Sequence, residues 1–290
     1  MKIYYINLES SVERRQCMES QLTGLELNYE RVAAVDGKSL SIQQIRRYRQ
    51  RTPSAPHLSN GAVACFLSHL KVWKMIAKKT DQFSVVMEDD IYISTHSRKL
   101  LETSSWIPVE TPLIKLETTF AKAFFGQEIR MSPIGGYRFI LRNCTIPWQN
   151  GYETGSGSAC YIIHKNFAEW LTQFFKRFSW HVDVEFVRAE IFGVHSSNPV
   201  KGYPLQLFPA IAVQQSLATQ VKNRHFDYTV LLSPEGYSGT ISHHPPRTNP
   251  NIWAKVVREV TRVITVSQYV RQYRQLRRKI FGRRVPFIGK

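Results

Sequence analysis

The chain has few cysteines and no long apolar runs. Its four cysteines, Cys17, Cys65, Cys144 and Cys160, form no C-x-x-C pair and no cluster with the spacing of metal ligands. Sparse, scattered thiols are typical of a reducing compartment. No apolar stretch approaches the roughly 20 residues that span a bilayer, and the apolar run at the start, 1–9, is too short for a signal peptide. The sequence therefore predicts a protein of the cytoplasm or of the cytoplasmic face of a membrane.

Acidic residues are also scarce, with 22 Asp and Glu against 39 Lys and Arg, so the net charge is +17. Residues 253–290 hold 11 Lys and Arg and one acid, Glu259, so more than half of the excess lies in this short segment. This distribution indicates a basic appendage rather than a basic fold. We predict one domain over residues 1–250, followed by a basic amphipathic helical tail at 251–290.

The chain lacks internal repeats, low-complexity runs, a G-x-G-x-x-G motif and a P-loop. Apolar periodicity instead predicts strands alternating with helices. Strands are expected at 2–8, 29–35, 113–116, 137–142 and 158–163 and in the apolar run that begins at Ser84 and ends at the acids 88–90. Residues 205–213 are expected to be an extended apolar segment, and helices are expected at 10–22, 40–51, 61–79, 165–175 and 184–192. Segment 120–136 is expected to be a loop near a site. The β-α-β start favours an α/β fold with a mixed, mostly parallel sheet flanked by helices.

Three consecutive carboxylates, Glu88, Asp89 and Asp90, follow the apolar run 85–87. Unpaired charges are too costly to bury, so these acids should open into a crevice at the carboxyl end of the strand, where open α/β sheets bind ligands. Side-chain alternation places Glu88 and Asp90 on one face. Their oxygen atoms suit Mg²⁺ or Mn²⁺. The alternative is an ordinary acidic turn after a strand.

Five short motifs follow one another in an informative order. They are Ile6–Leu8 with Glu13–Arg15 and Ala34–Gly37, then Gly61–His69 with Trp73, then Glu88–Asp90, then Gly157–Ile163, and finally Asp183 with Pro209 and Gln214-Gln215. This order resembles glycosyltransferase family 25, with its lipooligosaccharide galactosyltransferases and, more distantly, collagen galactosyltransferases. The resemblance covers about residues 2–220 and leaves out the tail. Cys160 departs from the small residue usual before the tyrosine of the fourth motif.

The resemblance implies a GT-A-type, Rossmann-like fold and an inverting glycosyltransferase. The donor would be a UDP-sugar, most often UDP-galactose, with UDP-glucose as an alternative. The acceptor would be a core sugar of lipooligosaccharide or lipopolysaccharide. The acidic triplet resembles the D-x-D metal motif of such enzymes, with Asp90 and Glu88 as ligands of Mn²⁺ or Mg²⁺ and Asp89 orienting them. Glu88 departs from a strict D-x-D.

Inverting transfer needs a carboxylate base for the acceptor hydroxyl and stabilisation of the leaving UDP. We predict Asp183 as the base, because it stands at an expected loop-to-helix junction. Glu185 and Glu153 are its rivals, and a plain helix N-cap is the alternative role of Asp183. A late histidine could complete the metal site, and the sequence does not select one among His225, His243 and His244.

The predicted donor contacts lie at the ends of the first two strands and on the helix at 61–79. They are Asn7, Arg14, Asp36, Gly37, Ser68 and His69, beside Glu88 and Asp89. Gly37 permits a tight turn. Arg14 could pair with phosphate or remain a solvated helix charge, and His69 has an ordinary structural role as its alternative.

A different class of function is a non-catalytic basic protein that binds nucleic acid or a membrane surface through the tail. Nucleic acid leaves the acidic triplet unexplained, so none is expected. The tail carries an apolar stripe from Trp253 among basic residues, which predicts contact with an anionic membrane surface that holds a lipid-linked acceptor. The protein would then be peripheral on the cytoplasmic face of the inner membrane. Alternatively, residues 252–264 pack on the enzyme or on a second subunit, as in a homodimer.

Overall fold

The computed structural model describes residues 1–50, 57–120, 157–185, 199–202 and 204–217, and the backbone of 125–131 and 138–142. The helices are α1 (Val12–Gly24), α2 (Ile42–Tyr48), α3 (Asn60–Ile76), α4 (Ser97–Leu101) and α5 (Lys165–Phe174). The strands are β1 (Lys2–Asn7), β2 (Tyr29–Ala33), β3 (Phe83–Glu88), β4 (Ile91–Ile93), β5 (Leu113–Lys115), β6 (Glu117–Thr118), β7 (Phe125–Met131), β8 (Arg138–Arg142), β9 (Cys160–His164), β10 (Leu205–Phe208) and β11 (Ala212–Gln214).

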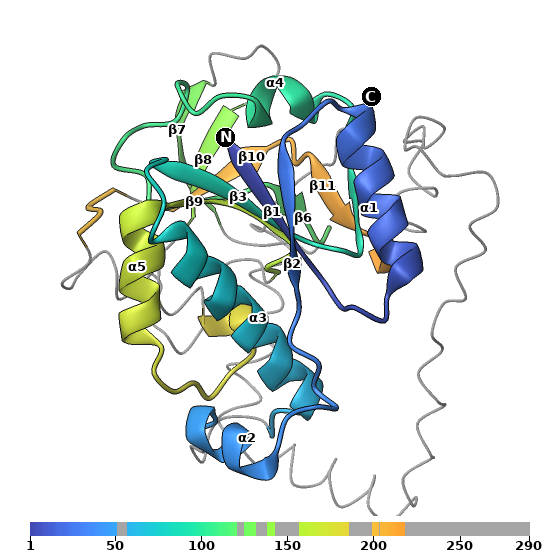
Figure 1. Cartoon of the computed structure of the whole chain (residues 1–290). Helices are drawn as coiled ribbons and strands as arrows, with labels where there is room; N and C mark the ends of the chain where they lie inside the picture. Colours follow the sequence, from blue (N-terminus) through green and yellow to red (C-terminus); the bar gives the residue numbers. More distant parts are fainter. Residues whose placement is uncertain are drawn as a thin grey trace, which may run out of the picture.

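An eight-stranded sheet with the order β2-β1-β3-β9-β5-β10-β8-β7 forms the centre of the molecule (Figure 1). A three-stranded sheet, β4-β11-β6, accompanies it. In the large sheet, β9 and β8 run against the other six strands. Strand direction is therefore mostly parallel, and the predicted mixed sheet flanked by helices is confirmed.

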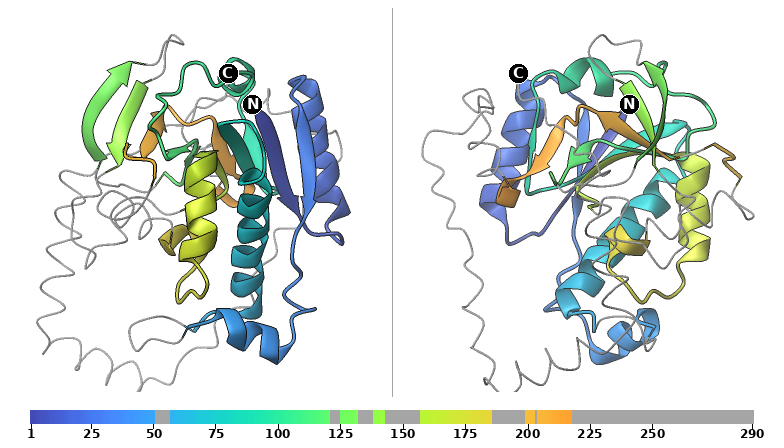
Figure 2. Two further views of the ribbon diagram at one scale, coloured as in Figure 1. Left: turned by 60° about the vertical axis from the view of Figure 1, so that its left-hand side comes forward. Right: turned by 180° about the vertical axis from the view of Figure 1, so that it is seen from behind.

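Side-chain alternation along the central strands produces two separate cores. β1 sends Ile3 and Tyr5 into one core, with the apolar faces of α1, α4 and the small sheet. It sends Tyr4 and Ile6 into the other, with α2, α3 and α5. Helices consequently cover both faces of the large sheet, as Figure 2 shows.

The connections leaving β1 and β2 set the position of the site. α1 follows β1 on one face, and α2 and α3 lead from β2 to β3 on the other face. β1 lies between β2 and β3 and is parallel to both. Neighbouring connections on opposite faces leave a crevice at the carboxyl ends of the strands, which is where such sheets bind ligands.

One prediction of local structure was wrong. Segment 120–136, predicted as a loop, contains β7, whose Gly-Gln-Glu sequence breaks the apolar alternation and whose pairing with β8 is irregular. The extended segment predicted at 205–213 is two strands in different sheets, β10 and β11. Helical residues begin at Val182, and the remainder of the helix predicted at 184–192 lies outside the described residues beyond Glu185.

The tail at 251–290 and the predicted domain boundary at 250 also lie outside the described residues. Among the helices that the structure does describe, none has the length and apolar character needed to cross a bilayer.

Gly37 lies where the chain leaving β2 meets the start of α3. A methyl group there would lie 2.9 Å from backbone atoms of Asn60 and Gly61. Since backbone cannot rotate away, we expect Gly37→Ala to lower the free energy of unfolding by about 1–3 kcal/mol. Gly61→Ala is the control, because its methyl would have the Ser59 hydroxyl at 3.8 Å and alanine favours helix. Denaturant titration of both variants measures the difference, and equal stabilities would contradict it.

Candidate functional site

A cavity of about 460 Å³ opens at the carboxyl ends of β1, β2 and β3. Residues of α3 and the acidic turn after β3 complete its wall. The predicted residues that line it are Arg14, Asp36, Gly37, Ser68, His69, Glu88, Asp89 and Asp90. All three acids face it because the chain turns at Asp89 and Asp90, so strand alternation stops at Glu88.

Asn7, the remaining predicted donor contact, is not part of this lining. It is 1% exposed and donates from its amide to Asp89 at 2.6 Å and to the carbonyl of Ser11 at 3.1 Å. Arg14 reaches the other oxygen of Asp89 at 3.0 Å. Burial raises the pKa of Asp89 despite the charge of Arg14. Asn7 therefore acts on the cavity through Asp89, whose carboxylate is held on both sides.

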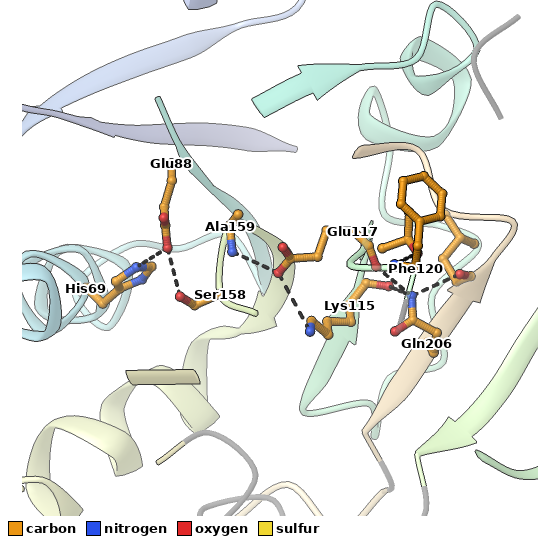
Figure 3. Close-up of polar contacts among 10 residues, drawn as sticks. His69, Glu88, Lys115, Glu117, Phe120, Ser158, Ala159 and Gln206 are labelled. Atoms are coloured by element: carbon orange, nitrogen blue, oxygen red, sulfur yellow. Dashed lines mark hydrogen bonds and ion pairs between the residues drawn. The ribbon is translucent and has the colours of Figure 1, made fainter. Parts of the chain in front are cut away.

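Glu88 is held by α3 and by the segment before β9 (Figure 3). His69 Nε2 lies 3.1 Å from Glu88 Oε1, and the Ser158 hydroxyl donates to the same oxygen at 2.8 Å. The other ring nitrogen of His69 lies 2.9 Å from the Tyr161 hydroxyl. Burial acts to raise the pKa of Glu88, but the hydrogen bond and charge of His69, then the Ser158 hydrogen bond, outweigh it and the pKa is lowered. Glu88 is therefore a fixed, charged carboxylate.

Asp90 has the least satisfied carboxylate of the three. Its Oδ1 atom is buried, and no hydrogen-bond partner for it exists among the described residues. Burial, and then the charges of Glu88 and Asp89, raise the pKa of Asp90 to about 7. The backbone amide of Gln215 donates to its carbonyl at 2.7 Å and fixes the turn. A buried carboxylate oxygen without a partner fits a ligand of a hard cation.

Two overlapping sets of donor atoms could hold a cation. Glu88 and Asp90 offer oxygen, which suits Mg²⁺ or Mn²⁺. Cys65, His69 and Glu88 bring donor atoms within 4.8 Å of one another, and sulfur with imidazole suits Zn²⁺. Burial, followed by the charges of Glu88, Asp183 and Asp90, raises the pKa of the Cys65 thiol. The buried, unpartnered Oδ1 atom of Asp90 belongs to the oxygen set and favours it.

The sequence analysis did not predict that Cys65 would lie beside His69 and Glu88. Cys65 and His69 are four residues apart on α3, and this spacing places them on one face of a helix. The pattern C-x-x-x-H on a predicted helix was the signal that could have found them.

Asp183 lies in the helical turn at 182–185 and is partly exposed. It is not among the residues that line the cavity. The carbonyl of His181 accepts from the amides of Val184 and Glu185. His181 is therefore the capping position, and Asp183 is the second residue of the turn.

The other two base candidates differ from Asp183. The Glu185 carboxylate belongs to a residue that is 2% exposed, and it accepts hydrogen bonds from the backbone amides of Ser179 and Trp180, both at 3.1 Å. This geometry favours a structural role. Glu153 lies outside the described residues, as do the late histidines His225, His243 and His244.

Glu117 is a buried acid that the sequence analysis missed (Figure 3). Its Oε1 accepts from the amide of Ala159 at 2.8 Å and lies 3.8 Å from the Lys115 ammonium. Its Oε2 lacks a hydrogen-bond partner within the described part of the chain. Burial raises the pKa of Glu117, Lys115 opposes this, and the charge of Glu88 adds to it. Gly157, with φ of 121°, packs so closely that a methyl group would lie 2.9 Å from this carboxylate.

Tyr161 connects the core to the site. Its hydroxyl accepts a hydrogen bond from Trp73 Nε1 at 2.8 Å and lies 2.9 Å from His69, which in turn contacts Glu88. Removing a buried hydrogen-bonding group costs about 1–3 kcal/mol. We therefore expect Tyr161→Phe to lower the free energy of unfolding by this amount. Tyr29→Phe is the control, since its hydroxyl contact is exposed, and a similar loss in both variants in a denaturant titration would count against the network.

Comparison with known proteins identifies relatives that match part of this chain. Procollagen galactosyltransferase 1-A of Xenopus laevis is 32% identical over 110 residues, which cover 35% of this chain and 18% of that protein. Procollagen galactosyltransferase 2 of Homo sapiens is 34% identical over 108 residues, covering 34% and 17%. A Rattus norvegicus relative named probable inactive glycosyltransferase 25 family member 3 is 32% identical over 108 residues, covering 35% and 19%. The match thus spans less than a fifth of each of these curated relatives.

Among solved structures, a glycosyltransferase involved in the glycosylation of the major capsid of PBCV-1 aligns with a TM-score of 0.37 at 10% identity, covering 73% of this chain and 91% of that one. The family model described as Glycosyltransferase family 25 (LPS biosynthesis protein) matches residues 1–186 of the 290. This range includes β1, β3, α3 and the acidic turn, and it confirms the resemblance seen in the motifs. The chain therefore belongs to glycosyltransferase family 25.

Proposed function

We propose that this chain transfers a hexose from a nucleotide sugar to a glycan acceptor, on a GT-A-type fold. The observation that carries the proposal is the acid-lined cavity at the carboxyl ends of β1, β2 and β3 in a family 25 chain. The unpartnered oxygen of Asp90 beside Glu88 supports a cation site. Arg14, on the same wall, offers a guanidinium group for a diphosphate.

For the donor we favour UDP-galactose, with UDP-glucose as the alternative. Two relatives are named procollagen galactosyltransferases, and the motif order resembles that of lipooligosaccharide galactosyltransferases. For the acceptor we favour a core sugar of lipooligosaccharide or lipopolysaccharide, in line with the description of the matching family. The resemblance to this family also implies inversion at the anomeric carbon.

The mechanism assigns separate tasks to the residues around the cavity. Asp183 takes the proton of the acceptor hydroxyl as its oxygen attacks the anomeric carbon and the bond to UDP breaks. Glu88 and Asp90 would hold Mn²⁺ or Mg²⁺, which when bound supplies positive charge to the leaving diphosphate. Ser68 accepts from the amide of Val35 at 2.9 Å and so fixes the end of β2 against α3. The nucleotide side of the cavity is thereby held rigid.

Donor binding tests the proposal without turnover. Saturation-transfer NMR of the full chain with UDP-galactose, UDP-glucose and UDP-N-acetylglucosamine, with Mn²⁺ and again after chelation, ranks the donors. We expect the strongest saturation for UDP-galactose, and its loss after chelation. Arg14→Gln should weaken binding, whereas Arg98→Gln, at an exposed residue of α4, should not. Absence of saturation with every donor would overturn the proposal.

A second candidate is a family member that binds a nucleotide sugar without transferring it. The relative named probable inactive favours this reading. Donor saturation in the presence of Mn²⁺ without donor hydrolysis or transfer would support it over the first.

We also propose that the tail at 251–290 rests on an anionic membrane surface, with the protein peripheral on the cytoplasmic face of the inner membrane. The 11 Lys and Arg of 253–290 and the apolar stripe from Trp253 support this. Vesicle co-sedimentation should weaken about tenfold or more in Arg274→Gln/Arg277→Gln/Arg278→Gln. If the protein is a dimer and does not co-sediment with vesicles in the same assay, packing of 252–264 on a second subunit would be favoured instead.

A further inference from the structure

Positive charge is concentrated in a second place besides the tail. Residues 37–80 contain nine Lys and Arg and no Asp or Glu. Residues 1–36 and 81–252 together contain 19 Lys and Arg against 21 Asp and Glu. The tail and the acid-free segment at 37–80 therefore account for all of the net positive charge. This segment forms α2 and α3, which lie on one face of the large sheet (Figure 1).

A groove of about 430 Å³ runs between α2 and α3. Its floor is mainly aliphatic and includes Val35, Leu40, Leu67, Leu70 and Met75. Its rim carries three exposed lysines of α3 and the residues just after it, at spacings that place them on one helix face. These lysines are Lys71, Lys74 and Lys78.

α2 lines the groove with Gln44 and Tyr48, and it carries further exposed residues outside the groove lining. Arg46 and Arg47 are both exposed, and Ile42, the first residue of the helix, is 70% exposed. The arrangement combines aliphatic contact area with a border of positive charge.

These charges have no acidic counterpart among the residues that the structure describes. Of the ion pairs formed within the described part of the chain, none includes Lys74, Lys78 or Arg46. Lys71 donates to the carbonyl of Ala33 at 2.9 Å. Exposed like charges at helical spacing repel one another. An anionic partner would relieve this repulsion and would add attraction of its own.

We propose that the groove between α2 and α3 docks on an anionic lipid bilayer. The lysines of the rim fit the headgroup phosphates, and the apolar floor fits the glycerol and upper acyl region. Single-stranded nucleic acid binds instead on aromatic stacking platforms. The aromatic residue of this groove, Tyr48, has the guanidinium of Arg47 over its ring at 5.7 Å.

Docking here would bring the candidate active site to the membrane. Val35 lines both the groove and the acid-lined cavity, so the two share a wall at the end of β2. The advantage of docking, that the enzyme lies near an acceptor held in the membrane, rests on the proposed sugar transfer. The docking itself does not depend on that proposal, because vesicle binding can be measured without a donor.

Vesicle flotation of the full chain tests this inference, with Lys74→Gln/Lys78→Gln compared with Arg98→Gln/Lys99→Gln. Both variants lose two positive charges from exposed side chains, and α4 contributes no residue to the groove. We expect the groove variant to bind phosphatidylglycerol vesicles about tenfold more weakly at low salt, and the α4 variant less than about twofold.

Equal losses in the two double variants, or no loss in the groove variant with its melting temperature preserved, would overturn the docking site. Retention on single-stranded oligonucleotides in preference to vesicles would also overturn it. Donor saturation by NMR should be unchanged in Lys74→Gln/Lys78→Gln, so failure of docking and failure of sugar transfer are distinguishable. The tail is intact in every variant, so a loss specific to the groove variant belongs to the groove.

Discussion

Asp90→Asn is expected to remove most sugar transfer, on the order of 100-fold in kcat/KM, while the fold persists. The amide keeps the shape of the side chain but removes the negative charge that a divalent cation requires. Although Asp90→Asn is expected to lower activity, it is expected to raise the stability of the metal-free protein. The pKa of Asp90 is raised to about 7, so in metal-free protein its ionisation costs stability as pH rises from about 4 and remains unfavourable above 7. The variant should therefore melt higher than the wild type at pH 8 with chelator present, and the difference should vanish near pH 4.

Asp81→Asn is the matched control, because Asp81 is an exposed acid before the same strand, β3. It should leave both transfer and melting temperature unchanged. Transfer at the wild-type rate by Asp90→Asn would remove Asp90 from the cation site. A lower melting temperature at pH 8 would indicate a structural role for its charge.

Asp183→Asn is expected to lower kcat by about 10²- to 10⁴-fold, the range that a general base contributes. Donor affinity should change little, because the base acts on the acceptor proton in the transition state. The measurement is kcat with a soluble acceptor beside the donor Kd from an NMR titration. Asp183 lies inside the turn that His181 begins, so loss of a helix cap is not expected to lower stability.

Two further variants separate chemistry from structure. Glu169→Gln alters an exposed acid of α5 and should leave kcat unchanged. Glu185→Ala removes the acceptor of two backbone amides, so we expect a loss of about 1–3 kcal/mol in stability. Parallel losses of donor binding and turnover in Asp183→Asn would contradict the assignment of the base.

The fold was predictable wherever the apolar residues of a segment repeat with the period of a helix or of a strand. β1, α1, β2 and α3 each show a clear apolar pattern, and their bounds agree with expectation to within a few residues. β7 was not predictable, because Gly126, Gln127 and Glu128 interrupt the pattern and the strand depends on its partner β8. The insertion of β9 between β3 and β5 is likewise a non-local pairing that no short sequence pattern displays.

The candidate site was predictable to the extent that strand ends define it. Parallel neighbours present their carboxyl ends together, which brought Asp36 and the acidic triplet into one cavity. Ser158 and Glu117 come from distant segments whose role depends on the sheet order, and sequence reasoning missed both. Asn7 was expected to face the donor but turns inward, because the buried carboxylate of Asp89 requires a donor of hydrogen bonds.

The position of β10 has a consequence for how the chain folds. The segment matched to the family ends at residue 186, yet β10 lies between β5 and β8 in the large sheet, and β11 lies between β4 and β6 in the small one. A nascent chain released only up to 186 would expose the bare edge of β5, which is a site for mispairing. The pairings of β10 and β11 with their neighbours span long sequence separations, so folding should be slow. Both sheets should be completed only after Gln214 has left the ribosome.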